Sequence, residues 1–236
     1  MSATARTFET DPHVVKAMFA YRRHTGSAVA DFRRRLARDS DERARPTISG
    51  LRRHTRSVTT ETGYRNGDPV YDAVDELWFD DERAARHAVT SPWFEALRER
   101  VGADPTSSAV FLVDEHLIKR GEIRDGGLKN FEFVKRRPDL SIEAFRRYWH
   151  DHHGPLACHI EVMRHYVQSH TIDSEYAGGA TPAWDGSAIT WFDDLDAMRA
   201  SGVSEAYTAT RNDEANFLSA PLALPFIITT ERVLAG

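Results

Sequence analysis

Apolar and polar positions in the second half of the chain follow the periods of strands and helices in turn. Residues 129–135 (KNFEFVK) alternate and are rich in aromatic side chains, which predicts a strand. Ser141 can cap a helix with apolar residues on one face, and we expect Gly154 and Pro155 to end that helix. The remaining predicted elements are a helical turn over 155–163, strands over 164–172, 187–194 and 225–234, and a helix over 196–215. Their order is that of the ferredoxin-like βαββαβ plan.

The first half of the chain repeats this pattern. Residues 71–81 (YDAVDELWFDD) match 184–194 (WDGSAITWFDD), and 28–39 (AVADFRRRLARD) match 141–152 (SIEAFRRYWHDH), both at an offset of 113. Several matches at one offset predict a tandem duplication. The predicted units are a flexible N-terminal arm over 1–12, a degenerate first repeat over 13–122 and a second repeat over 123–236.

The repeat predicts how the two halves pack. A four-stranded sheet of this plan has helices on one face only, so its other face needs a cover. Two such sheets can cover each other. The sequence therefore predicts an α+β fold in which two tandem ferredoxin-like (βαββαβ) halves form a pseudo-twofold α/β barrel, and the barrel interior is the expected pocket.

Histidines gather in the second half. The stretch 148–159 (YWHDHHGPLACH) holds four of the chain's 11 histidines, and the strand after it reads RHYVQSH. Neither His153 nor His170 has a histidine counterpart in the first half, which favours a single asymmetric site. Strand alternation places Tyr166 and Gln168 on the same face as His170. On the helix, Trp149 and His153 are four residues apart and share a face.

These residues resemble the pattern of the EthD family, a branch of the dimeric α/β-barrel proteins. The pattern is Phe-x-x-Tyr-Trp, then His-Gly-Pro-Leu, then Tyr-x-Gln-x-His on the next strand. Its positions in this chain are Phe145, Tyr148, Trp149, His153, Gly154, Pro155, Leu156, Tyr166, Gln168 and His170. The first half resembles a degenerate copy that keeps only Phe32. The resemblance implies cofactor-independent dehydration, decarboxylation, cyclisation or isomerisation of aromatic, polyketide-like or lactone substrates. The wider superfamily also includes cofactor-free monooxygenases and haem-binding branches.

We predict that His170 and His153 are the catalytic residues, because imidazole titrates near neutral pH and suits general acid/base chemistry. The residues expected to bind substrate are Tyr166, Gln168, Tyr148, Trp149 and His116. Structural alternatives stay open: His153 can cap its helix, His170 can make a structural hydrogen bond, and the strand residues can line the barrel without chemistry. His54, which aligns with Tyr166, is a weaker candidate.

Metal binding is the less favoured interpretation of the histidine cluster. Successive positions on a helix point about 100° apart, so His150, His152 and His153 cannot converge on one ion. The sequence contains no HExxH motif and no cysteine pair. It also contains no GxGxxG motif after a strand, no Walker A motif and no GxSxG motif. We therefore expect no cofactor and no metal.

The amino-acid composition limits the classes of binding partner that we expect. Of the 236 residues, 41% are hydrophobic and 28% are charged, and the net charge is −5 with both signs interspersed. This does not favour a nucleic-acid or membrane partner. The single cysteine, Cys158, cannot form an intrachain disulfide and fits a reducing cytoplasm. The expected partner is a small-molecule substrate, and a homodimer stays open.

The predicted function is a cofactor-independent lyase or isomerase with histidine acid/base catalysis in the barrel cavity. One alternative is a non-catalytic ligand-binding or stress-related barrel protein. Another is a cofactor-free monooxygenase or haem-binding barrel.

Overall fold

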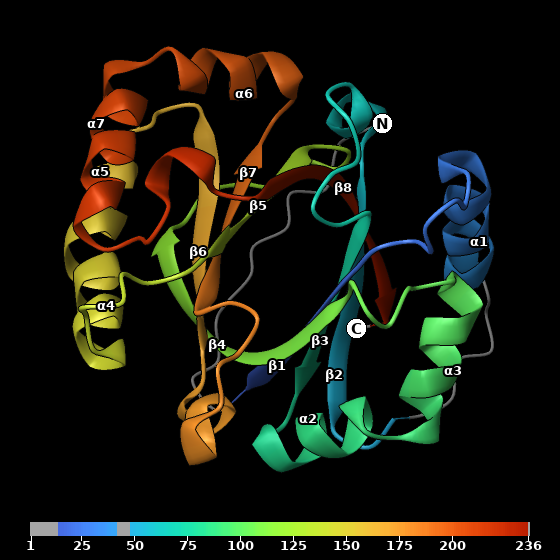
Figure 1. The fold of residues 1–236 in the computed structure, drawn as a ribbon. Helices are drawn as coiled ribbons and strands as arrows, with labels where there is room; N and C mark the ends of the chain where they lie inside the picture. The colour runs from blue at the N-terminus through green and yellow to red at the C-terminus, as the bar shows by residue number, and fades with distance from the viewer. Residues whose placement is uncertain (1–13, 42–47, 236) are drawn as a thin grey trace.

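The fold was analysed in a computed structural model that describes residues 14–41 and 48–235. The predicted arm over 1–12 lies outside the described residues. Within them, eight strands close into a barrel in the order β1-β3-β2-β8-β5-β7-β6-β4 (Figure 1). The strands are β1 (Val15–Tyr21), β2 (Leu51–Thr59), β3 (Ala73–Phe79), β4 (Ala109–Lys119), β5 (Leu128–Val134), β6 (Met163–Thr171), β7 (Gly186–Phe192) and β8 (Phe226–Ala235).

The strand order has the predicted twofold pseudosymmetry. Replacing β1 to β4 by β5 to β8, and the reverse, leaves the cyclic order unchanged. The register agrees: Val15 lies opposite Phe79 in β1 and β3, and Leu128 lies opposite Phe192 in β5 and β7. Both residues of the second pair are 113 positions after those of the first. The predicted α+β barrel of two ferredoxin-like halves is therefore confirmed, while the bounds of the two repeats stay predictions.

Helices cover the barrel on two opposite sides (Figure 1). The first half contributes α1 (Val29–Asp41), α2 (Glu82–Val89) and α3 (Pro92–Val101). The second half contributes α4 (Ile142–Tyr148), the π-helical turn η2 (Trp149–His153), α5 (Gly154–Ala157), α6 (Leu195–Gly202) and α7 (Glu205–Asp213). Short 3₁₀ turns lie at Glu61–Tyr64 (η1), Asp173–Gly179 (η3), Glu214–Asn216 (η4) and Pro221–Ala223 (η5). No helix in the described ranges is long and apolar enough to cross a membrane.

The helix that begins at Ser141 runs further than predicted. The Ser141 hydroxyl accepts a hydrogen bond from the Ala144 amide, as expected of an N-cap. The prediction that Gly154 and Pro155 end the helix is wrong, because the chain continues through η2 into α5. Pro155 lies in the first turn of α5, where a missing N–H is tolerated. A side chain at position 154 would meet Ile118 at 3.0 Å, so glycine lets this turn approach the sheet closely.

Packed side chains and buried charges fill the barrel interior. Lys16 Nζ lies 2.9 Å from Glu76 and 2.6 Å from Glu115. The pseudosymmetric Lys129 lies 2.5 Å from Glu231 and also pairs with Glu76, which therefore joins both halves. Burial raises the pKa of Glu76, but Lys129 and Lys16 outweigh burial and lower it to about 2. These charges are packed among apolar residues such as Met18, Phe111, Phe131 and Val167.

Candidate functional site

A cavity of about 230 Å³ lies outside the barrel, between the outer face of the second-half sheet and its helices. Strands β5, β6 and β7 form its floor, and η2, α5, α6 and α7 contribute its cover. Its polar wall includes Asn130, Glu132, His153, Tyr166, Arg211 and Glu214. Phe226, which is 55% exposed, also lines it, so the cavity reaches the surface there. This corrects the prediction that Tyr166, Gln168 and His170 line the barrel interior, since they face outward toward the helices.

Several residues that line the cavity are polar where the first half has apolar residues. At the offset of 113, Glu132 corresponds to Phe19, Tyr207 to Phe94 and Glu214 to Val101. In the first half, Phe19, Phe94 and Val101 pack together in one core cluster, with the two phenyl rings 4.9 Å apart. The corresponding positions of the second half carry polar side chains, and these side chains line the cavity between its sheet and its helices.

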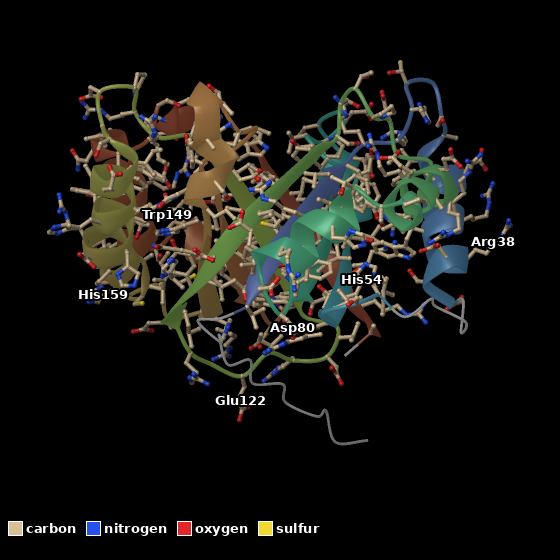
Figure 2. The ribbon with its side chains drawn as sticks, turned by 90° about the horizontal axis from the view of Figure 1, so that it is seen from below. Arg38, His54, Asp80, Glu122, Trp149 and His159 are labelled. Carbon is tan, nitrogen blue, oxygen red and sulfur yellow. The ribbon has the colours of Figure 1, made fainter. Side chains whose placement is uncertain are left out.

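The strand facing the first-half helices carries an ion network in place of the EthD-like residues. Arg56 stands where the second half has Gln168, and its guanidinium contacts Asp75 and Asp39. His54 lies 2.9 Å from the Asp75 carboxylate. Figure 2 shows His54 on the side of α1 and Trp149 on the side of α4. His54 is thus part of a buried ion network and does not line the cavity.

His153 is held at the cavity wall by a carboxylate. Its Nδ1 lies 2.9 Å from Asp213, which also accepts hydrogen bonds from the Tyr148 hydroxyl at 2.7 Å and from Asn216 at 2.9 Å. Burial raises the pKa of Asp213, but these three bonds outweigh burial and lower it. An ionised carboxylate only accepts, so Nδ1 carries the proton and Nε2 has the lone pair. Burial lowers the pKa of His153 more than the hydrogen bond to Asp213 raises it. The imidazole is therefore neutral at pH 7.

Tyr166 lines the cavity, and its hydroxyl oxygen accepts two hydrogen bonds. Its hydroxyl oxygen lies 3.2 Å from Trp149 Nε1 and 3.2 Å from Gln168 Nε2, both of which are donors. Because the oxygen accepts both bonds, its own proton remains available for donation. Burial raises the pKa of Tyr166, so the hydroxyl stays protonated at neutral pH.

His170 contacts two residues that hold the Tyr166 hydroxyl, Gln168 and Trp149. Gln168 Nε2 donates to the Trp149 carbonyl at 2.8 Å, so its Oε1 faces His170 Nε2, which donates to it at 3.0 Å. The His170 ring stacks on Trp149 with centroids 4.6 Å apart. Gly186 makes room for that indole, since a side chain there would meet it at 2.7 Å. Burial lowers the pKa of His170 well below its usual value, and nearby His116 lowers it further.

The structure separates the predicted site residues into two groups. Only His153 and Tyr166 line the cavity. The sequence left open whether His153 and His170 face one cavity, and in the structure His170 does not line this cavity but stacks on Trp149. Tyr148, Trp149 and Gln168 do not line the cavity but contact residues that do, or residues bonded to them. His116 lies beside His170, with ring centroids 4.3 Å apart, and does not line the cavity.

Sequence reasoning missed the acidic side of the cavity. Glu214 accepts a bond from Arg211 at 2.8 Å, and Glu132 hydrogen bonds to Asn130. Burial and then Glu132 raise the pKa of Glu214 to about 8, so this carboxyl is protonated at neutral pH. Burial also raises the pKa of Glu132. Comparison of the two copies at an offset of 113 could have found both, since each replaces an apolar residue.

The side chains of the cavity do not fit a haem or a metal site. About 230 Å³ is far too little for a porphyrin. Within residues 14–41 and 48–235, no group of three or more His, Cys, Asp or Glu side chains is arranged to hold a metal ion.

Comparisons with known proteins agree with the fold. Residues 137–221 match the EthD domain family, so the chain contains an EthD domain and the resemblance is confirmed for this segment. An anthrone oxidase-like protein aligns over 98% of both chains with a TM-score of 0.67 and 11% identity. A point mutant of chlorite dismutase from Candidatus Nitrospira defluvii aligns over 94% of this chain and 92% of its own, with a TM-score of 0.54 and 10% identity. At such identities the likeness is one of fold. No curated protein matches the sequence significantly.

Proposed function

We propose that the protein is a cofactor-independent lyase or isomerase in which His153 removes a proton from a small oxygenated substrate bound in the cavity. The observation that carries this proposal is the neutral imidazole, held by Asp213, at the wall of a cavity that Tyr166 also lines. A base, a group that orients it and an oxygen-binding donor are the parts that proton abstraction next to a carbonyl requires.

The proton follows a short route in this proposal. His153 Nε2 takes it from a carbon next to the substrate carbonyl, and the electron pair moves onto the carbonyl oxygen. Tyr166 donates a hydrogen bond to that oxygen, while Asp213 stabilises the imidazolium. Return of the proton to another carbon gives isomerisation. Loss of a hydroxyl that is protonated by Glu214 gives dehydration.

His170 has a positioning role in this scheme. It donates to Gln168, Gln168 donates to the Tyr166 oxygen, and that oxygen keeps its own proton available for donation. We therefore expect replacement of His170 to weaken oxygen binding rather than to remove the base. This revises the predicted roles, in which His170 was the base or acid and His153 its partner: His153 is now the proposed proton acceptor.

The size of the cavity limits the substrate. An engineered cavity of about 150 Å³ accepts benzene. The cavity here, about 230 Å³, has room for a substituted single ring or a small bicyclic compound. Among the aromatic, polyketide-like and lactone substrates that the family resemblance implies, its size favours the small ones.

Exchange of carbon-bound hydrogen in D₂O tests the base directly. The probe is 2-indanone, whose loss of α-protons is followed by NMR. We expect the wild-type protein to accelerate exchange above the buffer rate and His153→Gln to reduce this to the buffer rate. His159→Gln is the matched control, because His159 is exposed in the turn that follows α5 and lies at the outer edge of the molecule (Figure 2). Equal rates in wild type and His153→Gln would refute the role of His153, and a wild-type rate no faster than buffer would refute base catalysis on this probe.

A second candidate is a cofactor-free monooxygenase. The same substrate carbanion can react with dioxygen, and the full-length fold likeness to an anthrone oxidase-like protein favours testing it. Oxygen uptake that depends on substrate and on His153 would support the oxygenase and count against the lyase or isomerase. Ligand binding with neither exchange nor oxygen uptake would support the non-catalytic alternative.

A further inference from the structure

Two buried polar atoms at the cavity wall have no hydrogen-bond partner among the described residues. They are Asn130 Oδ1 and Glu214 Oε2, on side chains that are 8% and 3% exposed. Most buried polar atoms in proteins have a partner, and an unsatisfied one costs free energy. Both residues line one cavity, so rotation about their terminal side-chain bonds would turn these atoms toward a ligand bound there, which can supply the missing bonds.

The two atoms offer opposite kinds of hydrogen bond. The Asn130 amide nitrogen is engaged by Glu132, which leaves Oδ1 as an acceptor. Glu214 Oε1 accepts from Arg211 at 2.8 Å, so a proton on this carboxyl lies on Oε2 and is available as a donor. Burial, followed by the nearby charge of Glu132, raises the pKa of Glu214 to about 8, which keeps that proton in place at pH 7.

We propose that Asn130 and Glu214 form a subsite for the hydroxyl group of a phenolic ring. A hydroxyl group donates one hydrogen bond and accepts others, so a single group can bond to both residues. Apolar side chains, including Met163, Phe192 and Leu224, line the remainder of the cavity and suit an aromatic ring. The inference deepens the proposed function by naming the substrate class, and for the reaction of such a substrate it rests on that function.

The first half of the barrel supports this assignment by contrast. At the offset of 113, Asn130 corresponds to Ala17 and Glu214 to Val101. Both counterparts are fully buried in apolar core clusters. A position that only packs helix against sheet can therefore be apolar. The polar pair belongs to the half that has the cavity, which agrees with a role toward a ligand.

Calorimetric titration with three related probes tests the subsite without knowledge of the natural substrate. The probes are 4-methylphenol, 4-methylanisole, which cannot donate, and toluene. We expect the wild-type protein to bind 4-methylphenol about tenfold more tightly than either other probe, as expected when a buried pair gains its bonds. Comparable affinities for all three would overturn the proposal, and this comparison does not depend on the folding of any variant.

Variants identify the residues that recognise the hydroxyl. Asn130→Leu should bind 4-methylphenol and toluene equally well, with the toluene affinity preserved because the apolar wall remains. Glu214→Gln keeps a donor and should retain the preference for 4-methylphenol at pH 7. Thr190→Val, in the same cavity, is the matched control and should also retain it. A preference that persists in folded Asn130→Leu would overturn the proposal.

The binding test of the subsite and the exchange test of the proposed reaction can fail independently. His153→Gln removes the base but leaves Asn130 and Glu214, so it should bind 4-methylphenol with the wild-type preference. If 2-indanone exchange fails while this preference holds, only the proposed reaction is refuted. If exchange occurs without any preference for the hydroxyl, only the subsite is refuted.

Discussion

Replacement of Asp213 by asparagine should switch the tautomer of His153. In the wild type, Asp213 Oδ2 accepts from His153, and its Oδ1 accepts from Tyr148 and Asn216. Asparagine has one acceptor oxygen and one donor NH₂. If the oxygen keeps the bonds to Tyr148 and Asn216, the NH₂ faces His153 Nδ1. That nitrogen must then accept, which places the ring proton on Nε2, toward the cavity.

The expected loss of exchange rate in Asp213→Asn follows from two changes: the loss of the charged hydrogen bond to His153 and the loss of the lone pair on Nε2. A hydrogen bond to a charged partner contributes about 1.5–3 kcal/mol, and its loss weakens stabilisation of the imidazolium. The tautomer switch also removes the lone pair that accepts the substrate proton. A positioned general base contributes about 10²–10⁴ in rate, so we expect 2-indanone exchange to fall by about that factor. Tyr148→Phe is the milder control, because Asp213 keeps its charge and its bond to His153.

Long-range ¹H–¹⁵N NMR of the imidazole rings reads the tautomer without a substrate. The His153 signals are assigned by their loss in His153→Gln. We expect a protonated Nδ1 in the wild type and a protonated Nε2 in Asp213→Asn. A wild-type ring protonated on Nε2 would refute the reasoning, as would a variant that keeps both the wild-type tautomer and the wild-type exchange rate.

Four further predictions concern pH, the buried ion network and packing. If Glu214 is the proton donor in a dehydration, kcat/KM should decline above pH 8, and Glu214→Gln should remove this limb while the limb below pH 6.5, due to His153, remains. Because Lys129 and Lys16 lower the pKa of Glu76 to about 2, its contribution to stability is complete above pH 4.5 and declines as the pH falls through 2. Glu76→Gln should cost about 3–5 kcal/mol in urea unfolding at pH 7, because a buried ion pair loses one partner; a loss under 1 kcal/mol would show that the network adds little. Gly186→Ala should cost about 1–3 kcal/mol, because the new methyl group would approach the Trp149 ring at 2.7 Å and the Ser169 carbonyl at 2.5 Å, and an unchanged unfolding midpoint would contradict this packing.

The fold could be predicted from sequence because its signals are periodic and occur twice. Alternation located the strands, and the offset of 113 paired the halves before any contact was known. Alternation also grouped Tyr166, Gln168 and His170 correctly on one strand face. It could not tell which face points outward, because both faces of this sheet are buried, one in the barrel and one beneath helices.

The candidate site was predictable only in part, because its composition depends on distant contacts. The resemblance identified His153 and Tyr166, which line the cavity. Asp213 and Glu214 lie some 60 residues further along, and the packing of α7 against α5 brings them to His153 and the cavity. The helix was predicted to end at Gly154 because glycine and proline usually break helices, whereas here the glycine permits close approach to the sheet.

Methyl NMR of the methionines tests most directly where the protein binds its ligand. Met163 and Met198 line the cavity, whereas Met18 is buried in the barrel interior. With ¹³C-methyl-labelled methionine, we predict that titration with 4-methylphenol shifts the signals of Met163 and Met198 and leaves that of Met18 unchanged. A shift of Met18 with Met163 and Met198 unmoved would place the ligand inside the barrel and contradict this account.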